Sequence, residues 1–328
     1  MTRLLQVSGP EDPAIREAAE ILLAGGLVAF PTETVYGLGA DGLNPDAVAR
    51  IYAAKGRPAT NPVILHVADV EGARSLVSQW SDTARTLVEH YWPGPLTLVL
   101  PASGAVPSIV RAGGTTVALR CPAHPVALAL IRAVGRPLAA PSANRSQHLS
   151  PTQAQHVASS LGDAVDLILD GGPTEAGLES TILDLSRRRP RILRPGPVTP
   201  GELAGLIGEL EVWTGAIQAG QPQEAPGMAQ RHYAPRARLE VVAPGGGFST
   251  SAGPLAYVGF GALPALPEGV RGVLLPLDAE AVGTRLFALL HELDDAGYVR
   301  IVMEQPPEGE AWLAIRDRLR RASTQEQA

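Results

Sequence analysis

Four short polar segments of the chain carry the residue types that chemistry on an anionic ligand would need. Each contains cationic, hydroxyl or amide side chains and lies next to a run that predicts a β-strand. Because α/β sheets collect ligand groups at the ends of strands, we expect the four segments to meet at one site. They are PTETVYGLG (31–39), KGRPATNPVILHV (55–67), PSANRSQHLSPT (141–152), and ESTILDL (179–185) with RILRPG (191–196).

Lysine and asparagine are scarce in this chain and fall within these segments. Lys55 is the only lysine, and every other Lys or Arg position is arginine. Such a bias indicates that an ammonium, rather than a guanidinium, is needed at this position. Asparagine occurs only at Asn44, Asn61 and Asn144, and the last two lie inside the segments.

Each segment taken alone has an ordinary structural explanation. Lys55 and Arg57 follow a predicted helix, and such a pair is typical of a solvated helix end. Ser-x-Asn is typical of a turn, and His66 within a strand is typical of a core histidine with satisfied hydrogen bonds. For Arg187–Arg189 we keep such an explanation, a hairpin turn with exposed arginines. Only the four segments together favour a site.

The glycine-rich run Gly37–Gly42 fits the G-x-G-x-x-G pattern of dinucleotide-binding folds, but its surroundings do not. In that fold the glycines follow a strand and open a helix, with an acidic residue about 20 positions later. Here a polar loop precedes the glycines, and the corresponding position falls in NPVILHV (61–67), which has no carboxylate. The chain also lacks the G-x-x-x-x-G-K-[ST] phosphate loop, so a nucleotide would have to bind in another way.

The elements that position these segments interleave strands and helices over the first 210 residues. PTETVYGLGADG (31–42) is expected to be a loop, and no regular βαβ repeat emerges, so the fold class that we predict is α/β with an open, twisted, mixed sheet. Expected helices are 13–24, 46–55, 82–91, 123–134, 151–161 and 199–209; expected strands are 27–31, 61–67, 95–100, 115–120, 136–142, 164–172, 180–186 and 191–196.

The length of 328 residues predicts two domains, because single cores stop growing at roughly 250 to 300 residues. We place the larger domain at 1–210, a linker at 211–238 and a small C-terminal α/β domain at 239–328. The linker is rich in Gly, Pro, Gln and Ala, and it is long for a mere connection. Its segment PGMAQRHYAP (226–235) therefore favours a lid. The C-terminal domain, with helices expected at 278–296 and 308–321, carries no evident catalytic cluster.

Composition excludes several classes of protein. A hydrophobic content of 45% with 18% charged residues is typical of globular domains. The net charge of −6 argues against a protein that coats nucleic acid by bulk electrostatics. The first residues lack a signal peptide's apolar region, and no run approaches the roughly 18 apolar residues of a membrane span, so we expect the cytoplasm and no membrane contact. The single cysteine, Cys121, excludes an intramolecular disulfide and a cysteine-based zinc site.

In their order along the chain, PTET-x-YGL, K-x-R-P, S-x-N followed by SPT, and EST with RPG resemble the YrdC-like threonylcarbamoyl-AMP synthase family. The resemblance covers about residues 10–210, and PGMAQRHYAP resembles the longer, two-domain form of that family. Two positions depart from the pattern: Gln147 stands where a glycine is common, and Ala229 where a basic residue often follows PGM. The resemblance implies a YrdC-like fold and a nucleotidyltransferase that converts L-threonine, bicarbonate or CO₂, and ATP to threonylcarbamoyl-adenylate and pyrophosphate, for threonylcarbamoyladenosine formation in tRNA.

The same resemblance assigns residues to the two substrates. The ATP-binding positions are Arg57, Asn61, Thr116, Ser142, Ser150, Arg194 and Tyr233, and the L-threonine-binding positions are Thr34, His66, Arg120, Ala140 through its backbone, and Ser180. Asn144 is added to the ATP set, as a residue that orients the nucleotide or a metal-bound water. Arg120 suits a bidentate pair with the amino-acid carboxylate, whereas Arg57 and Arg194 suit phosphate oxygens. Lys55 and Arg57 are the expected catalytic cations, and Tyr233 would act from the lid.

The implied chemistry needs no strong protein base, because the carbamate of threonine is already an anion when it attacks the α-phosphate. Catalysis would consist of positioning and charge neutralisation, which suits a site of lysine, arginines, hydroxyls and asparagine. Mg²⁺ is the expected cofactor, held mainly by phosphate oxygens and water rather than by a protein site. The implied downstream partner is the machinery that transfers the threonylcarbamoyl group to tRNA, so direct tRNA contact would be weak or indirect.

Two alternatives remain open from the sequence. An enzyme of related fold transfers carbamoyl groups during metal-centre maturation, but it would normally carry extra zinc-binding cysteines. A non-catalytic RNA-binding protein would use its concave face, and the acidic net charge and the aromatic content of 4% count against that activity.

Overall fold

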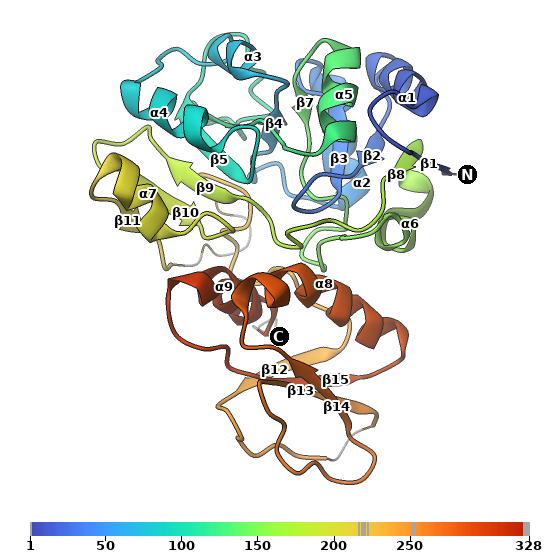
Figure 1. The fold of residues 1–328 in the computed structure, drawn as a ribbon. Helices are drawn as coiled ribbons and strands as arrows, with labels where there is room; N and C mark the ends of the chain where they lie inside the picture. Colours follow the sequence, from blue (N-terminus) through green and yellow to red (C-terminus); the bar gives the residue numbers. More distant parts are fainter. Residues whose placement is uncertain (1, 216, 218–220, 222, 251–252, 324–328) are drawn as a thin grey trace.

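The computed structural model describes residues 2–215, 217, 221, 223–250 and 253–323. It consists of an N-terminal domain built on a long sheet and a smaller C-terminal domain with its own sheet (Figure 1). Residues 216, 218–220 and 222 of the predicted linker lie outside the described residues, as do 251–252 and 324–328 of the predicted C-terminal domain.

The described residues of the N-terminal domain form one sheet of eleven strands in the order β1-β8-β2-β3-β7-β4-β6-β5-β9-β10-β11. The sheet contains parallel pairs such as β4 with β6 and antiparallel pairs such as β3 with β7, which confirms the prediction of a mixed α/β sheet. The strands are β1 (Arg3–Gln6), β2 (Val28–Phe30), β3 (Gly37–Asp41), β4 (Ile64–His66), β5 (Leu96–Pro101), β6 (Thr116–Arg120), β7 (Leu138–Ala139), β8 (Leu167–Asp170), β9 (Thr181–Asp184), β10 (Arg191–Arg194) and β11 (Glu211–Val212).

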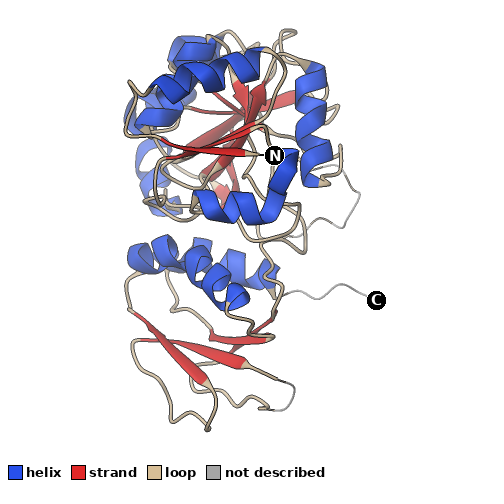
Figure 2. Cartoon of the chain, turned by 90° about the vertical axis from the view of Figure 1, so that its right-hand side faces the viewer, coloured by secondary structure: helices blue, strands red, loops and turns tan. Residues whose placement is uncertain are grey.

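Helices cover both faces of this sheet (Figure 2). Within β2, Ala29 packs into one hydrophobic cluster while Val28 and Phe30 pack into another, as the two-residue period of a strand requires when both faces are buried. The helices are α1 (Pro13–Leu23), α2 (Pro45–Lys55), α3 (Val70–Arg74), α4 (Asp82–Tyr91), α5 (Pro125–Val134), α6 (Ala154–Leu161), followed by a 3₁₀ turn (Gly162–Ala164), and α7 (Pro200–Ile207).

Helix α2 has the clearest local signals and delivers the cationic segment to the sheet. The Asn44 side chain accepts hydrogen bonds from the amides of Asp46 and Ala47, Pro45 starts the helix, and Gly56 ends it with a φ of 59°. Lys55 is therefore the last residue of the helix, where the helix dipole favours a cation.

One expected loop is partly a strand. Residues 37–41 of PTETVYGLGADG form β3, which pairs with β2 and β7 in the middle of the sheet. A Cβ at Gly39 would lie 2.8 Å from the Phe30 ring, so the glycine permits close packing within the sheet rather than a phosphate turn. The short elements β1, α3 and β11 were also not expected.

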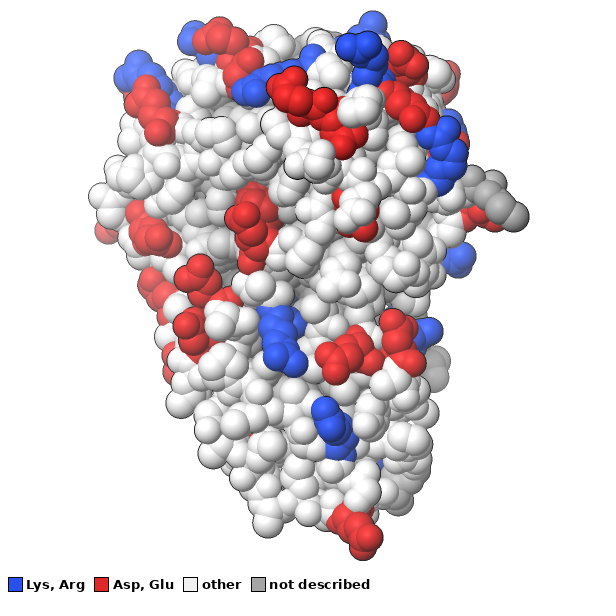
Figure 3. Space-filling view, turned by 45° about the vertical axis from the view of Figure 1, so that its right-hand side comes forward, with Lys and Arg blue, Asp and Glu red and all other residues white. Residues whose placement is uncertain are grey.

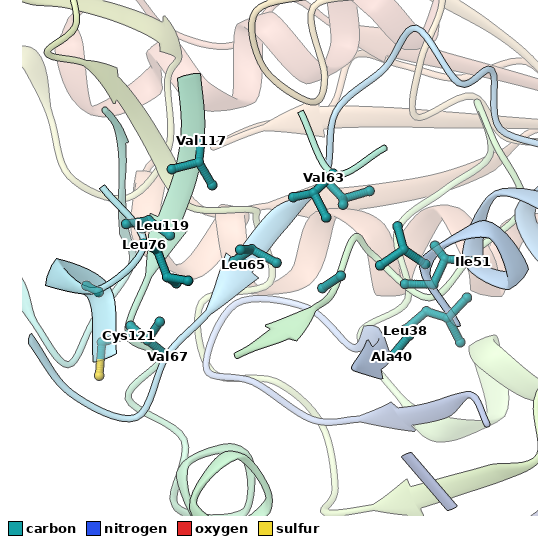
Figure 4. Close-up of a cluster of buried hydrophobic side chains, with 14 of the residues drawn as sticks. Leu38, Ala40, Ile51, Val63, Leu65, Val67, Leu76, Val117, Leu119 and Cys121 are labelled. Carbon is teal, nitrogen blue, oxygen red and sulfur yellow. The ribbon is translucent and has the colours of Figure 1, made fainter. Parts of the chain in front are cut away.

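The larger core lies against one face of the N-terminal sheet. Side chains of β3, α2, β4 and β6 meet there, among them Leu38, Ile51, Leu65 and Leu119 (Figure 4). Burying such aliphatic side chains stabilises the fold by roughly 1.5 to 3 kcal/mol each. This packing fixes the strands whose ends carry the polar segments.

The C-terminal domain is a small parallel α/β unit, which confirms the expectation of a second domain. Its sheet has the order β12-β15-β13-β14, and every described pair in it is parallel. Helices α8 and α9 lie between this sheet and the N-terminal domain (Figures 1 and 2). The elements are β12 (Arg238–Val242), β13 (Leu255–Phe260), β14 (Arg271–Leu275), α8 (Ala279–Asp295), β15 (Arg300–Glu304), a 3₁₀ turn (Glu310–Trp312) and α9 (Leu313–Ala322).

On the face shown in Figure 3, basic side chains are interspersed with acidic ones over both domains. This face does not provide the single-sign field that nucleic-acid coating requires. Within the described residues, every helix is too short or too polar to cross a membrane.

Candidate active site

Three central strands bring three of the predicted threonine-binding positions together. Because β4 and β6 are parallel, His66 at the end of β4 is the register partner of Arg120 at the end of β6. Ala140 follows β7 directly, and its amide donates a 3.0 Å hydrogen bond to the carbonyl of Ile64. Sheet pairing alone therefore places the imidazole, the guanidinium and the backbone of Ala140 in one neighbourhood.

These residues lie on the wall of a central cavity, which nine of the predicted site residues line. The cavity has a volume of about 40 Å³, whereas ligand pockets usually have roughly 300 to 1,000 Å³. A nucleotide can enter only if part of the wall moves. The lining residues are Thr32, Thr34, Val35, Gly37, Arg57, Ile64, His66, Arg120, Ala140, Pro141, Ser142, Glu179, Ser180, Arg194, Pro226, Gly227, His232 and Tyr233.

Part of the wall comes from the segment that we predicted as a lid, residues 226–235, which we call the lid below. Tyr233 is 1% exposed and has a φ of 61°, a left-handed backbone that costs a non-glycine residue roughly 1 to 2 kcal/mol. A Cβ at Gly227, whose φ is 86°, would lie 2.5 Å from the Tyr233 hydroxyl oxygen and 3.0 Å from Cδ of Arg194. The glycine thus allows the tyrosine to press against the arginine. In the structure, four residues of this segment, Pro226, Gly227, His232 and Tyr233, line the cavity.

Both departures from the family pattern lie where the lid is held. Gln147 has a φ of 69°, the left-handed region that explains why glycine is common there. Its carbonyl accepts a 2.9 Å hydrogen bond from the amide of Ala234, and its side chain accepts one from Arg231 at 3.3 Å. The carbonyl of Ala229 accepts a hydrogen bond from Arg321 of α9.

Two buried arginines on the cavity wall donate hydrogen bonds to neutral groups. Arg57 donates to the carbonyl of Asn61 (3.1 Å) and to its side-chain oxygen (2.6 Å), so Asn61 positions Arg57 and does not itself line the cavity. Arg194 donates to the carbonyl and hydroxyl of Ser180 at 3.1 and 3.2 Å. Burial lowers the pKa of Arg57 to about 10, and it lowers the pKa of Arg194 as well. The charge of Arg194 also lowers the pKa of Arg57, so the wall favours a bound anion.

Arg120 already has a partner for each nitrogen of its guanidinium. Nη1 donates to the Thr34 hydroxyl (2.8 Å), Nε donates to the carbonyl of Gly94 (3.2 Å), and Nη2 pairs with a Glu33 carboxylate oxygen at 2.6 Å. Both Arg120 and Glu33 are buried. These partners leave N–H groups of the guanidinium unused, so a ligand carboxylate that binds Arg120 would share it with Glu33.

Lys55 lies behind the wall rather than on it. Its ammonium donates to the carbonyls of Ser142 and Asn144, which fixes the Ser-x-Asn turn, and the residue is 3% exposed. Burial and then the charge of Arg57 hold its pKa well below the usual range. The need for an ammonium has a structural reason here, because a compact donor fits between two carbonyls that a planar guanidinium would not suit.

Three further predicted residues do not line the cavity. Thr116 starts β6, four residues and roughly 13 Å along the strand from Arg120. The Ser150 hydroxyl donates to the Glu179 carboxylate. Asn144 donates to the carbonyls of Arg145 and His148 at 2.8 Å, while its buried side-chain oxygen has no hydrogen-bond partner among the described residues. That oxygen is available to a nucleotide or to a water.

Both histidines on the wall are neutral. Burial and then the charge of Arg120 lower the pKa of His66 to about 3. Burial, followed by the charges of Arg57 and Lys55, holds the pKa of His232 well below its usual value. Within the described residues, the buried Nδ1 of His66 has no hydrogen-bond partner, so it is available to a ligand.

Sequence reasoning missed four residues around this site. Glu33 and Glu179 stand inside the quoted segments, so their position next to hydroxyls could have indicated them. His232 stands next to Tyr233 in the lid. Arg318 of α9 contacts Glu179 at 2.8 Å. No motif in the sequence indicated this residue, so the C-terminal domain was not expected to contribute to the site.

The donor set does not form a protein metal centre. Within the described residues, no group of three or more histidine, cysteine, aspartate or glutamate side chains could hold a metal ion. The carboxylate on the cavity wall belongs to Glu179, and it is paired with Arg318. The side-chain oxygen of Asn144 suits a metal-bound water, so these residues fit a divalent cation that enters with a polyphosphate.

Comparisons with known proteins agree over both domains. A family model of Sua5, YciO and YrdC proteins, described as telomere recombination, matches residues 20–196, and the threonylcarbamoyl-AMP synthase C-terminal domain matches residues 198–324. The threonylcarbamoyl-AMP synthase of Pyrococcus abyssi is 41% identical over 95% of this chain and 95% of its own length. That of Bacillus subtilis is 48% identical over 70% of this chain and 67% of its own.

Solved structures give the same result. The crystal structure of P. abyssi Sua5 complexed with L-threonine has a TM-score of 0.88 at 38% identity and covers 98% of this chain and 97% of its own. Escherichia coli YciO has a TM-score of 0.54 at 25% identity and covers 60% of this chain and 96% of its own.

Proposed function

The chain belongs to the threonylcarbamoyl-AMP synthase family in its two-domain form, and from this premise we propose how its site works. The protein joins L-threonine, bicarbonate or CO₂, and ATP into threonylcarbamoyl-adenylate and releases pyrophosphate. The product is the activated group used for threonylcarbamoyladenosine formation in tRNA. The enzyme is thus a nucleotidyltransferase.

The observation that carries the proposal is the buried pair of guanidiniums, Arg57 and Arg194, which line the same cavity as the lid tyrosine Tyr233. Their described side-chain hydrogen bonds go to backbone carbonyls, an amide oxygen and a hydroxyl, and burial lowers the pKa of each arginine. Buried cations without an equal number of carboxylates favour a polyanion. The triphosphate of ATP supplies that charge, and closing the lid would exclude water from the reaction.

The amino acid is assigned to the adjacent part of the cavity. Arg120 binds its carboxylate, and Thr34, His66 and Ser180 contact its polar groups. The threonine amine, as the free base, adds to CO₂ and loses a proton to give the carbamate. A carbamate oxygen then forms a bond to the α-phosphorus, and the bond from that phosphorus to the bridging oxygen breaks, with its electron pair leaving on pyrophosphate.

The chain's residues act on this reaction by orientation and by charge. Arg57 and Arg194 neutralise the charge that develops on the phosphate oxygens, and Lys55 holds the Ser-x-Asn turn that faces the nucleotide. Mg²⁺ neutralises phosphate charge when it is bound, and Asn144 would hold one of its waters. A downstream transfer machinery takes the product to tRNA, and direct tRNA contact by this chain is weak or indirect.

Pyrophosphate release tests the proposal. The wild-type protein should release pyrophosphate only when ATP, threonine and bicarbonate are all present, and serine should replace threonine roughly 10 to 200 times less effectively, the usual worth of one methyl group. Arg57→Met should abolish most release, whereas Arg85→Met, at a side chain 61% exposed on α4, should not. Pyrophosphate release that does not depend on threonine would refute this function. No release at all would also refute it and would agree with a non-catalytic RNA-binding protein.

A further inference from the structure

Helix α9 of the C-terminal domain places an arginine between the wall and the lid of the central cavity. Arg318 is 1% exposed. Its Nε donates to a Glu179 carboxylate oxygen (2.8 Å), and its Nη1 donates to the carbonyl of Pro195 (2.9 Å). Its guanidinium carbon lies 5.0 Å from the centroid of the Tyr233 ring, within the range of a cation–π contact. One side chain thus contacts the wall and the lid together.

The partner on the wall, Glu179, is a buried carboxylate among cations. Burial favours its neutral form, but Arg318 and then Arg194 outweigh burial and hold its pKa below the usual range. Its other oxygen accepts a hydrogen bond from Ser150, a predicted nucleotide-binding residue. Without Arg318, Arg194 would be the cation left to compensate the negative charge of Glu179. Arg194 would then be less available to a phosphate.

Neighbouring residues of α9 keep Arg318 in place and hold the lid. Asp317 accepts hydrogen bonds from Arg318 (3.2 Å) and Arg321 (3.0 Å). Arg321 donates to the carbonyl of Ala229 in the lid, and its own carbonyl accepts a 3.3 Å hydrogen bond from the amide of His232. The helix therefore anchors the lid on either side of residues 230 and 231.

We propose that Arg318 is a positioning residue of the nucleotide site, acting through Glu179 and Tyr233, so that the C-terminal domain completes the active site. This inference rests on the proposed function. A residue that merely joined the two domains would affect stability and leave the Michaelis constants unchanged. A positioning residue changes the KM for ATP, to which Ser150, Arg194 and Tyr233 are assigned, more than the KM for threonine.

Arg318→Lys tests this split, with Arg316→Lys as the matched control. Arg316 lies on the same helix and donates to Pro307, Glu308 and Gly309 within the C-terminal domain. Lysine keeps the charge but loses the planar fork and the stacking, so Arg318→Lys should raise the ATP KM about tenfold or more and the threonine KM by less than about threefold. Equal KM changes in the two variants, or equal changes for both substrates in Arg318→Lys, would overturn the inference.

Two further measurements keep the test decisive. Amide hydrogen exchange at His232 and Ala234 should be about tenfold faster in Arg318→Lys than in Arg316→Lys without any substrate, because Tyr233 between them loses its contact with the Arg318 guanidinium. This readout distinguishes the inference from the proposed function, whose failure would be a wild-type protein that releases no pyrophosphate. If Arg318→Lys does not fold, the double variant Arg318→Gln/Glu179→Gln avoids an unpaired buried carboxylate. A wild-type ATP KM in that variant would overturn the inference.

Discussion

The neutral, buried His66 should make the N-terminal domain sensitive to acid. In the folded protein its pKa is about 3, whereas an unfolded histidine titrates near 6.5. Between these values the unfolded state binds more protons than the folded state, so stability rises with pH in this window. The stability that the neutral His66 allows is fully present above about pH 6.5, and it is lost as the pH falls from about 6.5 toward 3.

The size of the effect follows from the unfolded-state value. At pH 5 an unfolded histidine is almost fully protonated while His66 is not, and this difference costs the folded state about 2 kcal/mol relative to pH 7. The result hardly depends on the folded-state pKa, provided that it lies well below 5, as burial and the charge of Arg120 ensure.

The perturbation that isolates this contribution is His66→Gln. The variant should lose about 2 kcal/mol less than the wild type between pH 7 and pH 5, because glutamine does not titrate. Urea unfolding at both pH values, with hydrogen exchange of β4 and β6 amides to report the N-terminal domain alone, measures the difference. His90→Gln, at an exposed histidine of α4, should lose as much as the wild type. Identical losses in His66→Gln and the wild type would refute the reasoning.

Three other predictions concern the site and its lid. Lys55→Met should lower pyrophosphate release about 100-fold or more, and Lys55→Arg should not restore it, because the space between the Ser142 and Asn144 carbonyls fits an ammonium; a wild-type rate in Lys55→Met would show that the turn does not need the cation. Arg120→Lys keeps a charge beside Glu33 but loses the planar, two-nitrogen guanidinium, so initial rates should show a larger rise in the threonine KM than in the ATP KM. Equal rises in the two KM values would contradict the assignment of Arg120 to the amino acid. Protease cleavage within 223–235 should be slowed by ATP with threonine, and an unchanged rate would make the segment a spacer.

Local signals explain which parts of the fold could be predicted from the sequence. Helix α2 is bounded by Asn44, Pro45 and Gly56, which act through neighbouring backbone groups, so its limits were predicted nearly to the residue. Strand β3 could not be predicted in this way, because its glycine-rich sequence is typical of a loop. Its conformation is fixed by pairing with β2 and β7 and by the close approach of the Phe30 ring. Tertiary contacts, rather than local sequence, determine whether such a segment forms a strand.

The site also has residues that local motifs indicate and residues that only tertiary contacts place. Arg57, Arg194 and Tyr233 occur in motifs, and the structure brings them to one cavity. Arg318 occurs in the helix sequence LAIRDRLRRA, which is typical of a charged, solvated helix. Its burial depends on how α9 docks against Glu179, 139 residues away in the chain, and no local pattern encodes that contact. The sequence therefore predicted the side chains that line the cavity better than the residues that hold them in place.

The place of Arg318 in the chain also orders the events of synthesis. Domains of a growing polypeptide fold from the N-terminus onward, so the eleven-stranded sheet can form while α9 is still unsynthesised. In such a partial chain Glu179 would lack its arginine partner, and the carbonyl of Ala229 would lack its donor. Until α9 is in place, the site would bind ATP more weakly, so an unfinished polypeptide on the ribosome would form threonylcarbamoyl-adenylate less effectively than the finished chain.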